Sequence, residues 1–239
     1  MLSDWFRSPP NMMLFVGCSF TMGMELENPE EERFSSLVAN QLKTKHLNRS
    51  EAGLSNDGIL RKTIKYCEKQ PVDFAVIQFT KYSRREILNI KKPLPDTSPY
   101  LRINASNPSK GVKEYFAKLS TPEDDIANFY KNKFLLEFYL TSKKIPFYFL
   151  QLSKKINRNL GRYDRWKYHK SAWDEDYFAN YRSLWQKLSD QPVDCIYEIL
   201  GGDEDSGSPY FTSSQRPHPN AEGHRKIADH ILKNLKGDF

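Results

Sequence analysis

Residues 13–21 read MLFVGCSFT, an apolar run that ends in a small residue and a serine. The run over residues 13–16 is short and followed by Gly17, which is typical of a buried strand. A small residue there lets the chain turn sharply, so that Ser19 presents its hydroxyl at the edge of a sheet. Nearby backbone N–H groups could stabilise an oxyanion at that edge. The alternative is a plain Gly-Ser turn that leads into a helix.

Strands and helices alternate along the rest of the chain. Apolar residues at helical spacing predict helices over residues 31–45, 59–69, 121–142, 177–188 and 220–237. Short apolar runs rich in β-formers predict further strands over residues 72–80, 146–152 and 193–199. Such alternation predicts an α/β fold with a mostly parallel sheet that helices cover on both faces. The ligand site of such a sheet lies beyond the carboxyl ends of its strands.

Composition excludes several classes of protein. The chain has 239 residues, 38% hydrophobic and 28% charged, which suits a globular domain with its own core. It has no apolar run long enough to span a membrane, and its polar N-terminus does not resemble a secretory signal. The three cysteines are far apart, which excludes a disulfide framework and indicates a reducing, cytoplasmic setting. The net charge of +6 indicates solubility and is no evidence for nucleic acid.

Two polar segments interrupt the alternation, so we expect one domain over residues 1–239 with two insertions. Residues 81–120 contain prolines and little periodicity, which is typical of a functional insertion or a lid. In residues 154–173, Lys and Arg outnumber the acid Asp164 and are interleaved with Tyr and Trp. Basic groups with stacking faces suit a polyanion, a nucleic acid strand or a sugar. Our expectation is against nucleic acid, and it leaves contact with a substrate or another partner open.

A histidine near the other end of the chain could serve Ser19 as its base. His218 lies between two prolines, directly before a helix that Asn220 is expected to cap. A histidine held in such a rigid loop could reach across the sheet to a serine that follows the first strand. His224 lies inside the predicted helix, and we expect it to support packing.

Three stretches together resemble the conserved blocks of the SGNH/GDSL hydrolases. They are GCSFT at residues 17–21, GLSNDGI at residues 53–59 and PHPNAEGH at residues 217–224. The resemblance implies a three-layer, flavodoxin-like fold around a mostly parallel five-stranded sheet. It also implies ester hydrolysis by a Ser-His mechanism, with no metal and no organic cofactor, and a small-molecule or carbohydrate ester as substrate.

The resemblance assigns roles to particular residues. It implies that Ser19 is the nucleophile and His218 the base, and that the backbone N–H groups of Ser19 and Asn56 form the oxyanion hole. Cys18 stands where the family usually has Asp, and Asn56 where it usually has an oxyanion-hole glycine. The family's Gly-x-Asn-Asp block is absent.

A different stretch, residues 80–86, stands in the place of the absent block. Its Thr80 and Arg84 resemble a pattern in some phage-type relatives. Together with Thr21, they are the candidate substrate-binding residues.

The most serious departure from the family pattern concerns the acid that completes its catalytic triad with the serine and the histidine. The family places it three residues before the histidine, where this chain has Gln215. An acid there holds the tautomer of the base and stabilises the imidazolium. Three explanations stay open. Asp205 or a neighbouring acid, Asp203 or Glu204, could reach the histidine; Gln215 or a carbonyl could orient the ring; or the protein is a weak or inactive hydrolase.

Two other functions remain open on the same scaffold. The first is a binding or virion structural protein that uses the insertions at residues 81–120 and 154–173 as contact surfaces, and it would be virion-associated if the chain is phage-derived. The second is an O-acyltransferase that passes the acyl group to a sugar hydroxyl. A nucleotide-binding flavodoxin-like domain is disfavoured, because the first loop lacks both GxGxxG and a P-loop lysine.

Overall fold

The computed structural model describes most of the chain outside the second insertion. The described residues are 9–88, 100–103, 110–118, 120, 122–153, 192–202, 207–212 and 218–235. The basic segment 154–173, the predicted helix 177–188, the acids 203–205 and Gln215 lie outside these ranges. Among the residues described, no helix combines the length and apolarity that a bilayer span requires.

A five-stranded parallel sheet in the order β2-β1-β3-β6-β7 forms the centre of the fold. This is the mostly parallel sheet that the sequence predicted. The strands are β1 (Met12–Val16), β2 (Lys45–Asn48), β3 (Phe74–Phe79), β6 (Phe147–Gln151) and β7 (Asp194–Cys195).

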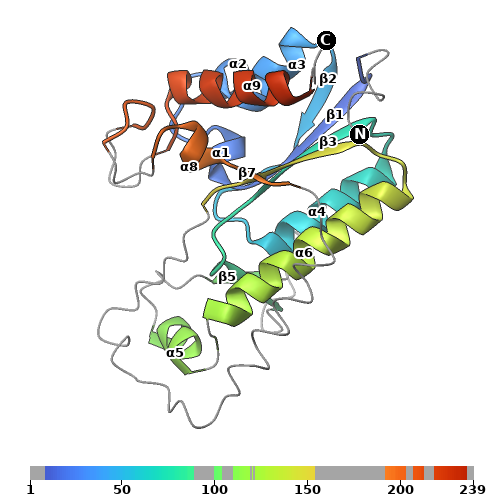
Figure 1. The fold of residues 1–239 in the computed structure, drawn as a ribbon. Coiled ribbons are helices and arrows are strands. Elements are labelled where there is room, and N and C mark those ends of the chain that lie inside the picture. The colour runs from blue at the N-terminus through green and yellow to red at the C-terminus, as the bar shows by residue number, and fades with distance from the viewer. Residues whose placement is uncertain are drawn as a thin grey trace.

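Helices cover both faces of the sheet and make the three layers visible in Figure 1. On one face α4 (Asn56–Lys69) packs against α6 (Pro122–Ser142). On the other face α3 (Phe34–Gln41) packs against α9 (Ala221–Leu235). This arrangement confirms the predicted α/β class.

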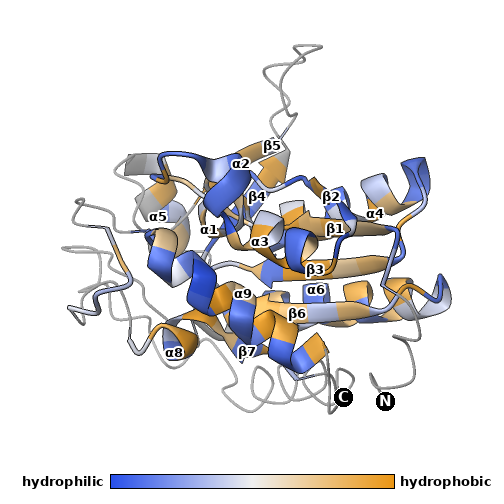
Figure 2. Cartoon of the chain, turned by 90° about the horizontal axis from the view of Figure 1, so that it is seen from above, coloured by the Kyte–Doolittle hydropathy of each residue, from blue (hydrophilic) through white to orange (hydrophobic). Residues whose placement is uncertain are grey.

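Two apolar cores lie between these layers, one on each side of the sheet. Alternate side chains of β1 enter different cores: Met13 and Phe15 face α9, whereas Leu14 and Val16 face α4. Every residue of β3 is buried, as expected for a strand covered on both faces. Seen from above in Figure 2, β1 and β3 are orange along most of their length, whereas α2 (Pro29–Glu32) is largely blue.

Two sequence predictions of secondary structure were wrong in part, and one strand was missed. The predicted helix 31–45 is broken at Arg33, whose extended backbone separates α2 from α3, and the chain then enters β2, which was missed. β2 lies at an edge of the sheet and is only half-buried, so it lacks an apolar run. The predicted strand 193–199 ends at Cys195, and residues 196–199 form a short helix, α8 (Ile196–Ile199), although Ile196 and Ile199 are β-branched.

The insertion at residues 81–120 is more ordered than its composition indicated. Its described part contains an antiparallel hairpin of β4 (Arg85–Leu88) and β5 (Tyr100–Ile103), followed by α5 (Lys110–Lys118). Ile103 and Phe116 form a small apolar core between the hairpin and α5. The insertion therefore has a core of its own beside the main sheet.

Candidate active site

Ser19 begins a short helix directly beyond the carboxyl end of β1. Cys18 has an extended backbone, and α1 (Ser19–Met22) starts at the serine. The first N–H groups of a helix have no acceptor within it, so the backbone N–H of Ser19 points away from α1. The serine side chain lies among buried residues, and Ser19 as a whole is 5% exposed.

Gln78 of β3 holds the turn that carries Ser19. Its Oε1 accepts hydrogen bonds from Cys18 N at 3.0 Å, from Cys18 Sγ at 3.2 Å and from Thr21 Oγ1 at 3.0 Å. A Cβ on Gly17 would lie 2.2 Å from Thr21 Oγ1 and 2.7 Å from Gln78 Oε1. Only glycine therefore fits between the turn and β3. Our sequence analysis missed Gln78, although a polar residue inside an otherwise apolar buried strand is a usable signal.

His218 approaches Ser19 from the other end of the chain. Its Nε2 lies 2.9 Å from Ser19 Oγ, across a sequence separation of 199 residues. The backbone N–H of Thr212 donates to the His218 carbonyl at 2.9 Å, and the neighbouring Phe211 and Pro219 form a β-bridge. The ring of Phe20 packs on the imidazole with 5.3 Å between centroids. His218 is thus held by backbone bonds of the residues around it and by α1, the helix that Ser19 begins.

Glu25 lies on the far side of the imidazole. Its Oε1 is 3.4 Å from His218 Nδ1, and its side chain is 26% exposed. The second carboxylate oxygen accepts a hydrogen bond from Thr212 Oγ1 at 2.5 Å. Sequence reasoning missed Glu25, because nothing in the sequence separates it from the acids that follow it. Asp205, the acid named from the sequence, lies outside the described residues.

Asn56 begins α4 behind a Ser55 cap, whose Oγ accepts from Gly58 N at 3.0 Å. As the first helical residue, Asn56 has a backbone N–H without an acceptor in the helix. Its Oδ1 accepts from Thr80 N at 2.9 Å. Its Nδ2 is buried and has no hydrogen-bond partner in the described structure. The loop before α4 and the end of β3 are therefore joined at Asn56.

The three predicted substrate-binding residues have different surroundings. Thr21 is buried, and its hydroxyl donates to Gln78. Thr80 is also buried, and its hydroxyl accepts from Arg84 Nη1 at 2.7 Å. Arg84 is partly exposed. Thr80 and Arg84 thus lie together at the carboxyl end of β3, and contact of all three residues with a substrate stays a prediction.

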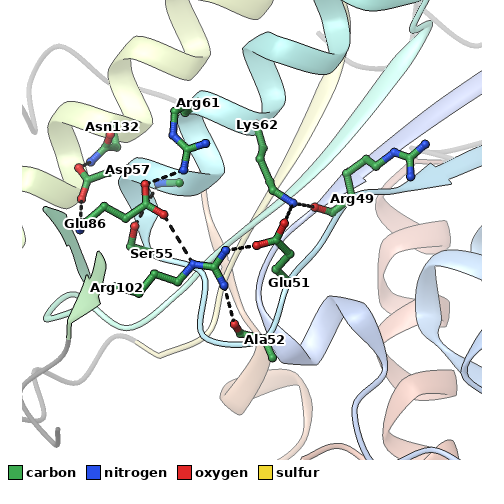
Figure 3. A network of polar contacts seen from close by, with 11 residues as sticks. Arg49, Glu51, Ala52, Ser55, Asp57, Arg61, Lys62, Glu86, Arg102 and Asn132 are labelled. Carbon is green, nitrogen blue, oxygen red and sulfur yellow. Dashed lines mark hydrogen bonds and ion pairs between the residues drawn. The ribbon is translucent and has the colours of Figure 1, made fainter. Parts of the chain in front are cut away.

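A polar network joins the hairpin of the insertion to the loop before α4 (Figure 3). Arg102 of β5 donates to the Ala52 carbonyl at 3.1 Å and pairs with Glu51. The side chain of Glu86 of β4 is almost fully buried and pairs with Arg61 of α4 at 2.7 Å. The insertion therefore braces the segment that leads to Asn56.

His224 is buried in α9 and supports packing, as expected from the sequence. Its Nδ1 accepts from Phe34 N at 3.2 Å, and its ring stacks on Phe34. Burial lowers the pKa of His224 from 6.5 to about 3, and the nearby His218 acts in the same direction. The folded state keeps His224 neutral where the unfolded chain binds a proton, so the stability from this group falls as the pH drops from 6.5 toward 3.

Replacing His224 with Gln is expected to flatten the acid side of the stability profile. Gln keeps an acceptor for Phe34 N but does not titrate. Between about pH 7.5 and about pH 4.5, the variant should lose about 2–3 kcal/mol less unfolding free energy than the wild type. Urea unfolding at both pH values measures this difference. Equal losses in the two proteins would contradict the assignment of His224 as a buried neutral group.

Among the described residues, no three His, Cys, Asp or Glu side chains gather as a metal site. No protein-family model and no curated protein sequence matches this chain.

Solved structures do match the fold, at low sequence identity. A lipolytic protein of the G-D-S-L family from Desulfitobacterium hafniense has a TM-score of 0.53 at 11% identity, with 94% of this chain and 99% of that chain covered. The esterase EstA from Pseudoalteromonas has 0.50 at 14% identity, covering 95% and 97%. An acetyl-xylooligosaccharide esterase from Geobacillus has 0.51 at 10% identity, covering 97% of both chains.

Proposed function

We propose that this chain, which has the fold of the GDSL/SGNH hydrolases, is a divergent serine esterase of that family. The observation that carries the proposal is the 2.9 Å contact between Ser19 Oγ and His218 Nε2. The contact lies where β1 ends, at the edge where parallel α/β sheets hold their ligands. The fold neighbours named above, a lipolytic protein and two esterases, give general support.

In the proposed mechanism Ser19 and His218 act as a nucleophile and its base. His218 Nε2 takes the proton of Ser19 as Oγ attacks the ester carbonyl carbon. The tetrahedral intermediate collapses when the C–O bond to the alcohol breaks and His218 gives its proton to the leaving alkoxide. Water, deprotonated by the same nitrogen, then cleaves the acyl-enzyme and frees the acid and Ser19.

The oxyanion of the intermediate is assigned to two helix starts. Ser19 and Asn56 are the first residues of α1 and α4, so their backbone N–H groups have no acceptor within their helices. Preorganised donors of this kind stabilise the charge that develops on the carbonyl oxygen. The unpartnered, buried Nδ2 of Asn56 is a further donor in the same region.

The proposed substrate is a small ester or an acylated carbohydrate. One fold neighbour is an acetyl-xylooligosaccharide esterase, which makes an acetylated sugar a reasonable first compound to test. Thr80 and Arg84, at the carboxyl end of β3, are the proposed contacts for the polar part of the substrate. The contact between Ser19 and His218 favours catalysis over the alternative of an inactive binding scaffold.

A covalent probe tests this function. The wild type should hydrolyse p-nitrophenyl acetate, and a fluorophosphonate should block that activity by labelling Ser19, identified by mass spectrometry of its peptide. Failure of the probe to label Ser19 would favour the binding or virion structural protein. Release of acylated sugar in place of free acid, when a sugar acceptor is added, would identify an O-acyltransferase.

A further inference from the structure

We infer that Glu25, six residues after the nucleophile, is the positioning acid that orients His218. This inference rests on the proposed function, since it assigns a role within the same site. It moves the acid from the histidine loop, where the resemblance places it, to the segment that follows the nucleophile's own helix. Three observations support it: the surroundings of the imidazole nitrogen Nδ1, the hydrogen bonds of Thr212, and the backbone conformation of Glu25.

The first support is that one imidazole nitrogen, Nδ1, requires a hydrogen-bond acceptor. His218 Nε2 faces Ser19 Oγ, so Nδ1 must carry the proton if Nε2 is to act as a base. Nδ1 is buried and has no hydrogen-bond partner among the described residues, although Glu25 Oε1 lies 3.4 Å away. Catalytic hydrogen bonds are often long in a free enzyme and shorten when substrate binds. A small shift of Glu25 would therefore complete the chain of contacts.

The second support is a threonine that ties the carboxylate to the histidine. Thr212 Oγ1 accepts a hydrogen bond from the backbone N–H of His218 at 3.2 Å. The same hydroxyl donates its proton to Glu25 Oε2, at 2.5 Å. Because Thr212 also donates its backbone N–H to the His218 carbonyl, it holds the carboxylate and the histidine loop in one arrangement.

The third support is the backbone that presents Glu25. Gly23, with φ at 82°, caps the end of α1, and Met24 N donates to Ser19 O at 3.0 Å. Glu25 itself has φ at 72°, in the left-handed region that non-glycine residues rarely adopt. Such local strain persists where the surrounding structure demands it and gathers at functional sites. Here it turns the chain so that the carboxylate returns toward His218.

A set of variants separates this role from a structural one. Glu25→Gln keeps the size but offers an amide that can donate to Nδ1, which would leave the proton on Nε2 and block the base. We expect a fall in kcat of about 10³- to 10⁴-fold with little change in KM. Glu25→Asp should recover part of the activity. Glu27→Gln is the matched control, because Glu27 is exposed and makes no hydrogen bond or ion pair within the part of the chain that the structure describes. Asp205→Asn tests the rival acid.

A second readout does not depend on turnover. In proton NMR, the imidazole N–H that faces a carboxylate gives a far-downfield resonance, which should be present in the wild type and in Glu27→Gln but lost in Glu25→Gln. Wild-type activity in Glu25→Gln, or loss of activity in Asp205→Asn alone, would overturn the inference while the esterase function stands. If the wild type has no activity, the esterase function fails. The far-downfield resonance then tests the role of Glu25 without turnover, and its persistence in Glu25→Gln would overturn the assignment of Glu25 as the acid that orients His218.

Discussion

Replacing Ser19 with Ala, His218 with Ala, or both residues together is expected to lower kcat by the same factor, roughly 10⁴- to 10⁶-fold. In the proposed mechanism the two side chains act as one unit, because a serine is a weak nucleophile until a base such as His218 removes its proton. Once either side chain is removed, removal of the other is expected to lower kcat no further. The 2.9 Å contact between Oγ and Nε2 is the structural basis of this non-additivity.

Steady-state kinetics with p-nitrophenyl acetate on the three variants measures the effect. Ser142→Ala is a matched control. Ser142 is exposed at the end of α6, which leads to the amino end of β6. Because Ser19 follows the carboxyl end of the parallel strand β1, the two serines lie at opposite ends of the strands. Its replacement should leave kcat unchanged. Losses that multiply in the double variant would show that the two residues act independently, against the proposed mechanism.

Replacing Gly17 with Ala is expected to destabilise the fold by about 2–3 kcal/mol, because the buried turn has no room for a methyl group. The added Cβ would lie 2.2 Å from Thr21 Oγ1 and 2.7 Å from Gln78 Oε1. The turn must shift to relieve this overlap, and Ser19 shifts with it. A displacement of about 1 Å of a catalytic group can lower the rate about 10²-fold.

Gly111→Ala provides the comparison for Gly17→Ala. Gly111 is exposed in α5, and a Cβ there would meet no atom within 4 Å. In a helix, Ala is generally favoured over Gly, so this variant should be neutral or slightly more stable. Urea unfolding and the rate of fluorophosphonate labelling measure both effects. A Gly17→Ala protein as stable and as reactive as Gly111→Ala would refute the account of the turn.

The sheet was largely predictable from sequence because its central strands are buried on both faces. β1, β3 and β6 are apolar almost throughout, and each was expected within one or two residues of its observed bounds. The edge strands carry less information. β2 is half-exposed and leaves no clear apolar pattern, whereas β7 was predicted but is only two residues long, so the predicted strand 193–199 was too long. α8 was mistaken for a strand because its β-branched residues pack into the core as a helix.

Parts of the insertion at residues 81–120 could not be predicted because their stability comes from distant partners. The hairpin is short, and an isolated hairpin is at best marginally stable in water. Its partners are charged groups on α4 and on the loop before α4, such as Arg61 and Glu51. Ion pairs between segments leave no periodic signal in either one.

The sequence by itself predicted which two side chains meet at the proposed active site, Ser19 and His218. A serine after the first strand and a proline-bound histidine before the last helix are local patterns. The parallel topology that brings them to one edge follows from the alternation of strands and helices.

Only the tertiary structure decided which acid faces the histidine. Glu25 reaches His218 through a left-handed turn at the end of α1 and through Thr212, which is 187 residues away in sequence. Which acidic side chain lies beside the imidazole depends on where the folded backbone places it. Nothing in its sequence neighbourhood distinguishes Glu25 from Glu27, because both are acids after the same short helix and only the folded chain places one of them beside the imidazole.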